Sequence, residues 1–145
     1  MAYATAAELA TRYGADRLVH LTDRDGDGIG DDPMINQAIA DAEAEIDGYL
    51  AARYQLPLPT VPAILARIAC DIAIYRLLSL RAMGDIDDAR RRYEDARRLL
   101  EAIAKGMVSL GLPASLPPAA QPALSLAAAK SGPAPVFGPD QMEGY

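Results

Sequence analysis

The chain has 145 residues, of which 51% are hydrophobic and 23% are charged, so it can bury one core but leaves little room for a second independent domain. With no Trp and a single Phe, the composition favours closely packed helices over aromatic-rich strands, and we expect an all-α fold. The formal net charge of −6 argues against a free-standing nucleic-acid binder, and no segment approaches the roughly 20 apolar residues of a membrane span.

The first part of the chain predicts two short helices and a loop. Thr5 and Glu8 fit the capping-box pattern, which starts a helix that should end near Gly14. Asp16 is a candidate cap for a second brief helical turn. Residues 22–32 are rich in Gly and Asp and predict a loop.

Two longer helices are predicted next. Asp32 and Pro33 look like an N-cap followed by proline at the first helical position, and apolar residues recur at helical spacing to about Tyr54. After a proline-rich linker, Thr60 is a candidate cap for a helix that carries only three charged residues before Leu80. This helix should therefore be the central and most buried one.

A last helix is predicted after a break at Met83-Gly84, and Lys105-Gly106 is its expected C-cap. Residues 107–112 are predicted to pair briefly as an extended segment. We therefore expect a small bundle of four to five helices in residues 1–112. Residues 113–145 form a Pro/Ala-rich arm with too few large side chains to order itself.

The end of the arm carries apolar side chains that a linker does not need. Val136, Phe137 and Tyr145 follow the low-complexity stretch and are candidate anchors for docking into a partner. The alternative is a frayed chain end without a function.

Side chains suited to catalysis are scarce. His20 is the single histidine, Cys70 is the single cysteine, and the sequence has neither a nucleophile motif nor a phosphate-binding glycine loop. Cys70 lies in an apolar helical stretch, where a thiol behaves as a small hydrophobe. We expect no enzymatic activity and no required cofactor.

The sharpest motif is the run from Asp23 to Gly28, which matches the first half of an EF-hand calcium loop. Asp23, Asp25 and Asp27 occupy positions one, three and five, and Asp31 falls at position nine. Position twelve, where a bidentate Glu should close the site, is Met34. The motif predicts either a weak or incomplete Ca²⁺ site or a tight turn in which aspartates accept backbone amides.

A cluster of five arginines is the candidate subunit interface, in which guanidiniums meet the acidic loop of a neighbouring copy. Acidic residues are interleaved at helical pairing distances, so a simple solvated face is the alternative. The cluster comprises Arg90, Arg91, Arg92, Arg97 and Arg98.

Several of these segments together resemble the small virion protein family of Mu-like prophages. The resemblance covers approximately Tyr3 to Leu112 and a closing Val136-Phe137-Gly138, and the long Pro/Ala-rich insert before that closing motif departs from the family pattern. It is carried by the runs Leu21 to Gly28, Ala42 to Leu50, Arg53-Tyr54, Leu56 to Pro59, Arg67 to Ala73, Tyr75-Arg76, Arg92 to Ala96 and Leu110 to Leu112, together with Pro62.

The resemblance implies a head-to-tail connector, or adaptor, of a tailed bacteriophage. Such a protein forms a homo-oligomeric ring beneath the portal protein, contacts tail-completion or neck proteins, and lets DNA pass through its lumen without specific binding. We then expect the protein in the neck of the virion, after synthesis in the host bacterial cytoplasm. The alternative is a calcium-responsive helical binding module that uses the Asp23–Asp31 loop.

Overall fold

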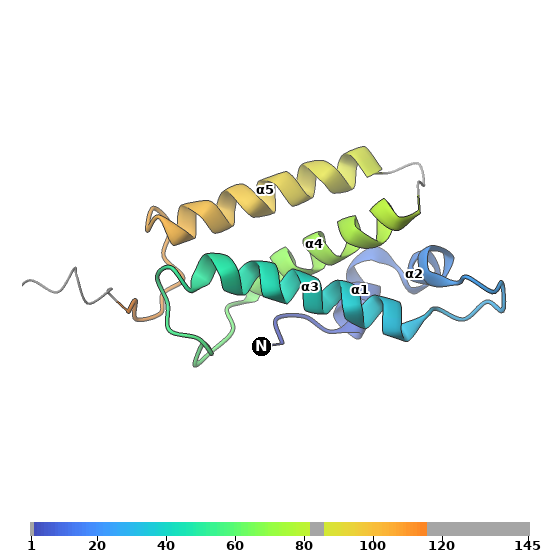
Figure 1. Cartoon of the computed structure of the whole chain (residues 1–145), viewed down its shortest axis with the longest axis horizontal. Helices are drawn as coiled ribbons and strands as arrows, with labels where there is room; N and C mark the ends of the chain where they lie inside the picture. Colours follow the sequence, from blue (N-terminus) through green and yellow to red (C-terminus); the bar gives the residue numbers. More distant parts are fainter. Residues whose placement is uncertain (1, 82–85, 116–145) are drawn as a thin grey trace, which may run out of the picture.

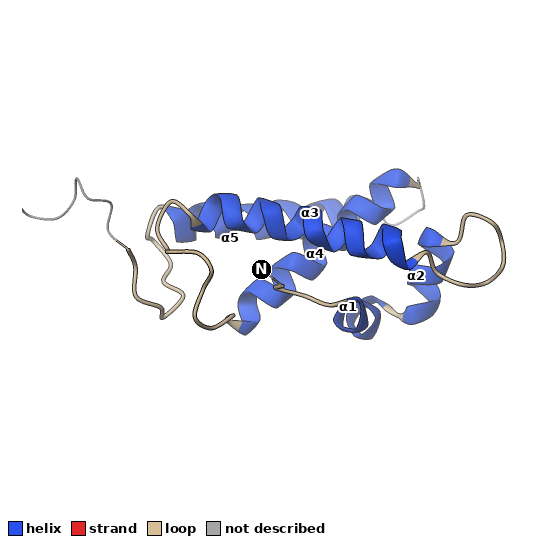
Figure 2. Ribbon diagram, turned by 60° about the horizontal axis from the view of Figure 1, so that its bottom comes forward, coloured by secondary structure: helices blue, strands red, loops and turns tan. Residues whose placement is uncertain are grey.

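The computed structural model describes residues 2–81 and 86–115, and in these ranges the chain forms five α-helices and no strand (Figure 1; Figure 2). The all-α prediction is confirmed. The predicted break at Met83-Gly84 and most of the predicted arm lie outside the described residues. The helices are α1 (Ala6–Tyr13), α2 (Ala15–Thr22), α3 (Asp32–Leu50), α4 (Ala63–Leu80) and α5 (Ile86–Ala104).

The three long helices form the body of the molecule. Helix α4 packs against both α3 and α5, and the short helices α1 and α2 pack against α3 and α4 (Figure 1). None of the described helices is long and apolar enough to cross a membrane.

Helix α4 is the central helix, as the sequence predicted. Apolar side chains lie all around it, because neighbouring helices cover most of its surface. Its buried residues are Leu65, Ile68, Ala69, Cys70, Ile72, Ala73, Ile74, Leu77 and Leu78. Burial raises the pKa of the Cys70 thiol to about 11, so the reactive thiolate is disfavoured at neutral pH.

The beginning of α1 follows the sequence prediction and that of α2 does not. The Thr5 hydroxyl accepts a hydrogen bond from the Glu8 amide at 3.2 Å, and the Glu8 carboxylate accepts one from the Thr5 amide at 2.9 Å. Gly14, with φ of 91°, ends α1 and also precedes α2. Asp16 therefore lies inside α2 instead of capping it. Glycine takes this positive φ without steric cost, which lets two helices follow each other directly.

Helix α3 differs from its prediction at both ends. Asp31, and not Asp32, is its N-cap, so Pro33 occupies the second helical position. The helix ends at Leu50, and the Arg53 and Tyr54 amides both donate to the Leu50 carbonyl in a final turn. Buried Tyr54 belongs to the following linker, although its apolar character extended the helical pattern.

Helix α4 begins after Pro62, and Thr60 does not cap it. The Pro62 carbonyl accepts the Leu65 amide at 2.9 Å, and no side chain caps this end. Proline has the backbone φ of a helix start and no amide that needs a partner there.

The predicted extended segment at residues 107–112 is not a strand. Gly106, with φ of 77°, lets the Met107 amide donate back to Ala102 at 2.9 Å, which ends α5 near the predicted cap. The chain then crosses the α3–α4 linker, where the Leu110 amide donates to the Tyr54 hydroxyl at 3.1 Å. No residue in the described ranges is assigned to a strand.

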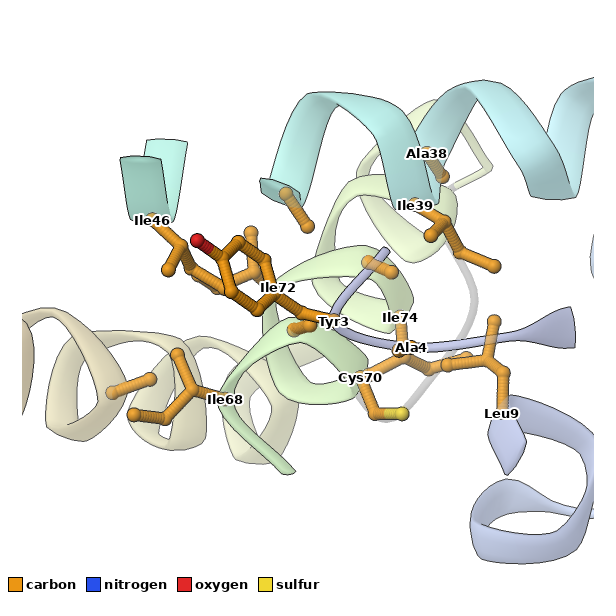
Figure 3. Close-up of a cluster of buried hydrophobic side chains, with 14 of the residues drawn as sticks. Tyr3, Ala4, Leu9, Ala38, Ile39, Ile46, Ile68, Cys70, Ile72 and Ile74 are labelled. Atoms are coloured by element: carbon orange, nitrogen blue, oxygen red, sulfur yellow. The ribbon is translucent and has the colours of Figure 1, made fainter. Parts of the chain in front are cut away.

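The N-terminal segment contributes to the core, which the sequence reading missed. Tyr3 and Ala4 are buried, and Figure 3 shows Tyr3 next to Ile46 and Ile72 and Ala4 next to Ile74. The Tyr3 amide donates to Glu43 at 2.8 Å, and the Tyr3 hydroxyl donates to Asp47.

A polar network also joins the three long helices. Glu45 of α3 accepts hydrogen bonds from Arg76 of α4 at 2.7 Å and from the Tyr93 hydroxyl of α5 at 2.9 Å. The ring of Tyr93 stacks on that of Tyr75, with centroids 4.6 Å apart. These contacts fix how α5 lies on the other two helices.

Candidate interaction surfaces

The acidic loop, residues 23–31, connects α2 to α3 and projects beyond the ends of both helices (Figure 1; Figure 2). Hydrogen bonds of Thr22 connect α2 to the last residue of the loop. The Thr22 hydroxyl, fully buried, donates to the Leu18 carbonyl at 2.8 Å and accepts the Asp31 amide at 3.1 Å. The loop therefore starts and ends at a fixed point of the bundle.

Three aspartates converge inside the acidic loop. Ligand atoms of Asp23, Asp25 and Asp27 all lie within 4.8 Å of one another. The two oxygens of Asp23 accept the amides of Gly26 at 2.7 Å and Gly28 at 3.0 Å. These hydrogen bonds, that from Gly28 first, lower the pKa of Asp23. The geometry is that of a tight turn organised by an aspartate, and it also brings together three carboxylates.

The fourth predicted ligand, Asp31, has a different role. Its carboxylate accepts the Met34 amide at 3.4 Å and caps α3. It does not belong to the group formed by Asp23, Asp25 and Asp27. Met34, at the position that should close a calcium loop, packs against the core. The described residues thus provide the first half of such a loop.

Four of the five arginines of α5 are exposed, and Arg92 is half-buried. Four of the five form ion pairs with acidic residues of the same helix: Arg90 with Glu94, Arg92 with Asp88, Arg97 with Glu101 and Arg98 with Asp95. Arg91 is exposed and has no ion pair within the described residues. Exposed pairs of this kind contribute little to stability, about 0.3–0.5 kcal/mol each. The arginines remain available for contacts.

A second cationic surface involves three helices. A cavity of about 390 Å³, named here the arginine pocket, opens where α1, α4 and α5 meet. It is lined by Arg12 and Tyr13 of α1, Arg67 and Asp71 of α4, and Arg92 and Asp95 of α5. Only Arg92 belongs to the cluster predicted from the sequence.

Tyr13 positions the charged groups of the arginine pocket. Its hydroxyl donates to the Asp71 carboxylate, and its ring lies under the Arg92 guanidinium with 5.4 Å between guanidinium carbon and ring centroid. Burial, and then the hydrogen bond to Asp71, raise the pKa of Tyr13, so the hydroxyl stays protonated at neutral pH. Arg92 Nε is buried and has no hydrogen-bond acceptor in the described part of the chain.

Sequence reasoning could not find the arginine pocket, because Arg12, Arg67 and Arg92 are far apart in the sequence and no motif joins them. The predicted docking residues Val136, Phe137 and Tyr145 lie outside the described residues. His20 is exposed at the end of α2. Its backbone carbonyl accepts a hydrogen bond from the Arg81 side chain at 2.7 Å.

The fold and these surfaces define the protein as a small all-helical bundle with an acidic loop at one end and an arginine-lined pocket between three of its helices. Comparison with known proteins identifies the family. The model of the family described as "Bacteriophage Mu, Gp36" matches residues 3–127, which is most of the chain. The chain therefore belongs to this bacteriophage protein family, and the resemblance seen in the sequence is confirmed.

Two relatives show how close the similarity is. "Gene product J" of Escherichia phage Mu is 42% identical over 113 residues, covering 77% of this chain and 78% of the relative. "Mu-like prophage FluMu protein gp36" of Haemophilus influenzae is 50% identical over 82 residues, 57% of this chain. The match spans 56% of the length of the Haemophilus protein.

Proposed function

We propose that this phage protein is a head-to-tail connector, one subunit of a ring that lies beneath the portal and joins the DNA-filled head to the tail. The observation that carries the proposal is the separation of charge on one small bundle. The acidic loop projects from one end, while three arginines line the arginine pocket between α1, α4 and α5. Identical copies placed side by side can pair such surfaces, and contacts of this kind close into a ring when the rotation permits.

The placement of exposed apolar residues supports an assembly role. Ile29 of the acidic loop is 69% exposed, and Leu80 at the end of α4 is 65% exposed. Met107, just past α5, is 72% exposed. The acidic loop and the end of α4 lie at one end of the bundle, and the end of α5 lies at the other (Figure 1). Both ends thus carry apolar side chains that a neighbouring protein could cover.

In the proposed ring, an acidic lumen lets DNA pass without specific binding, because like charges prevent tight phosphate contacts. The portal lies on one side of the ring and the tail-completion or neck proteins lie on the other. The proposed role is structural: it involves no catalysis and requires no cofactor.

The proposal is tested by the composition of phage particles. Heads and tails are separated from cells infected with a phage that lacks this chain, and the same cells are complemented with the wild-type chain as the control. We expect filled heads and complete tails that fail to join, with joining restored by the control. In wild-type particles, the chain should remain with the head after tails are detached. Recovery of the chain with free tails, or normal particles without it, would contradict the proposal.

One observation favours a second candidate, a calcium-responsive binding module. The convergence of Asp23, Asp25 and Asp27 within 4.8 Å provides three of the oxygen ligands that Ca²⁺ needs. Calorimetric titration of the protein with Ca²⁺, with Asp25→Ala as the control, separates the candidates. A connector needs no binding, whereas a sensor must bind Ca²⁺ and change conformation, and it must lose both properties in the variant.

A further inference from the structure

We propose that the arginine pocket receives the acidic loop of a second copy of this chain, so that each subunit offers the loop to one neighbour and the pocket to the other. This inference rests on the proposed ring and identifies which surfaces would meet within it. The sequence suggested the outer face of α5 for this contact, whereas the structure provides a cavity that draws on three helices.

The pocket has cationic groups that pair with no carboxylate in the part of the chain that the structure describes. Arg12 and Arg67 are exposed and have neither an ion pair nor a hydrogen bond in the described residues. The two acidic groups of the pocket already have partners: Asp71 accepts the Tyr13 hydroxyl, and Asp95 pairs with Arg98 at 3.3 Å. An incoming carboxylate therefore meets guanidiniums that are free to bind it.

The third guanidinium of the pocket is held in place. Arg92 lies over the Tyr13 ring at 5.4 Å and pairs with Asp88 at 3.1 Å, and its side chain is 37% exposed. A side chain that is already fixed loses little conformational entropy when a partner binds. Arg92 thus forms a fixed wall of the pocket, beside the exposed Arg12 and Arg67.

The acidic loop has matching chemistry. Residues 23–31 contain four aspartates and one arginine. Asp25 and Asp27 are exposed, and the loop projects beyond the helices, so both can reach another molecule (Figure 2). Exposed Ile29, next to these residues, adds an apolar side chain that docking would cover.

The loop and the pocket occupy different parts of one molecule. The loop extends from the ends of α2 and α3, whereas the pocket lies between α1, α4 and α5, and no hydrogen bond or ion pair connects them in the described residues. When each chain offers its loop to one neighbour and its pocket to another, the contact is heterologous, and such contacts close into a ring where the rotation permits and otherwise extend into open filaments.

Two variants separate the halves of this contact. The loop variant, Asp25→Lys with Asp27→Lys, keeps Asp23, which organises the turn. The pocket variant, Arg12→Glu with Arg67→Glu, keeps Arg92 and its stacking on Tyr13. Circular dichroism should confirm that both remain folded, because the changed side chains are exposed.

Nuclear magnetic resonance then detects the contact even when it is weak. Isotope-labelled loop variant, which has an intact pocket, is titrated at low ionic strength with unlabelled pocket variant, which has an intact loop. We expect saturable shifts of the Tyr13, Arg67 and Arg92 amide signals that weaken as salt is added. The control is an unlabelled chain with all four substitutions, which should cause no shifts of these pocket signals.

Absence of shifts in the mixture, or shifts confined to another surface, would overturn the inference. Its failure is distinguishable from failure of the proposed function. If the pocket signals do not shift but the chain remains with heads after the tails are detached, the connector role stands and its subunits meet elsewhere. If the pocket signals shift but the chain is absent from particles, the contact stands and the connector role fails.

Discussion

Replacement of Tyr3 by phenylalanine should destabilise the bundle far more than its place near the chain start suggests. The Tyr3 side chain is 3% exposed and its hydroxyl donates to the Asp47 carboxylate on α3. Hydrogen bonds to charged groups contribute about 1.5–3 kcal/mol. Asp47 is half-buried, so water can partly replace the lost donor, and we expect a loss of about 1–2 kcal/mol in the free energy of unfolding.

Urea denaturation followed by circular dichroism at neutral pH measures this loss. The control is Tyr49→Phe, because Tyr49 is half-buried against the core on α3 and its hydroxyl has no hydrogen bond in the described residues. The control should change stability by less than about 0.5 kcal/mol. Equal losses in the free energy of unfolding for the two substitutions would refute the hydrogen bond between the Tyr3 hydroxyl and Asp47.

The same variant should alter the response to alkaline pH. Burial, and then the hydrogen bond to Asp47, raise the pKa of Tyr3 above its usual value. The folded chain therefore keeps this proton while the unfolded chain releases it near pH 10, so stability falls as pH rises above about 10. Tyr3→Phe removes a contribution to this slope of up to about 1.4 kcal/mol per pH unit. An unchanged slope would show that the hydroxyl titrates normally in the folded state.

Three further predictions concern the core, the assembly surfaces and the arm. Ile72→Ala at a fully buried position of α4 should cost about 2–5 kcal/mol in urea denaturation. Arg91→Glu with Arg98→Glu should change stability by less than about 1 kcal/mol yet impair assembly on portals, and normal assembly would reduce the α5 cluster to a solvated face. Deletion of residues 136–145 should preserve the melting temperature of the isolated protein but produce heads that lose DNA or fail to join tails, whereas infectious particles of normal yield would show that the arm is dispensable.

The helices could be predicted from the sequence because local signals determine them. The capping box of Thr5 and Glu8 and the helical spacing of apolar residues needed no tertiary context. The ends were less predictable where two neighbouring residues can fill the same role. Asp31 and Asp32 are both good N-caps, and only the hydrogen bond between the Thr22 hydroxyl and the Asp31 amide decides where the loop ends.

The surfaces were only partly predictable. The acidic loop could be found because its aspartates and glycines lie within a few residues of one another in the sequence. The same local pattern predicted a tight turn, which Asp23 forms. The arginine pocket could not be found, since Arg12, Arg67 and Arg92 meet only after α1 packs beside α4 and α5 beside α4. Tyr3 was missed for the same reason, because nothing near it in the sequence indicates that Glu43 and Asp47 lie on the facing side of α3.

Imaging of native phage particles by electron cryomicroscopy tests the connector proposal most directly. The density between portal and tail should contain a closed ring in which each subunit fits the bundle of α1 to α5, with the acidic loop of one copy against the adjacent copy. A neck whose rings fit only other proteins, or density for this bundle elsewhere in the particle, would contradict the proposal.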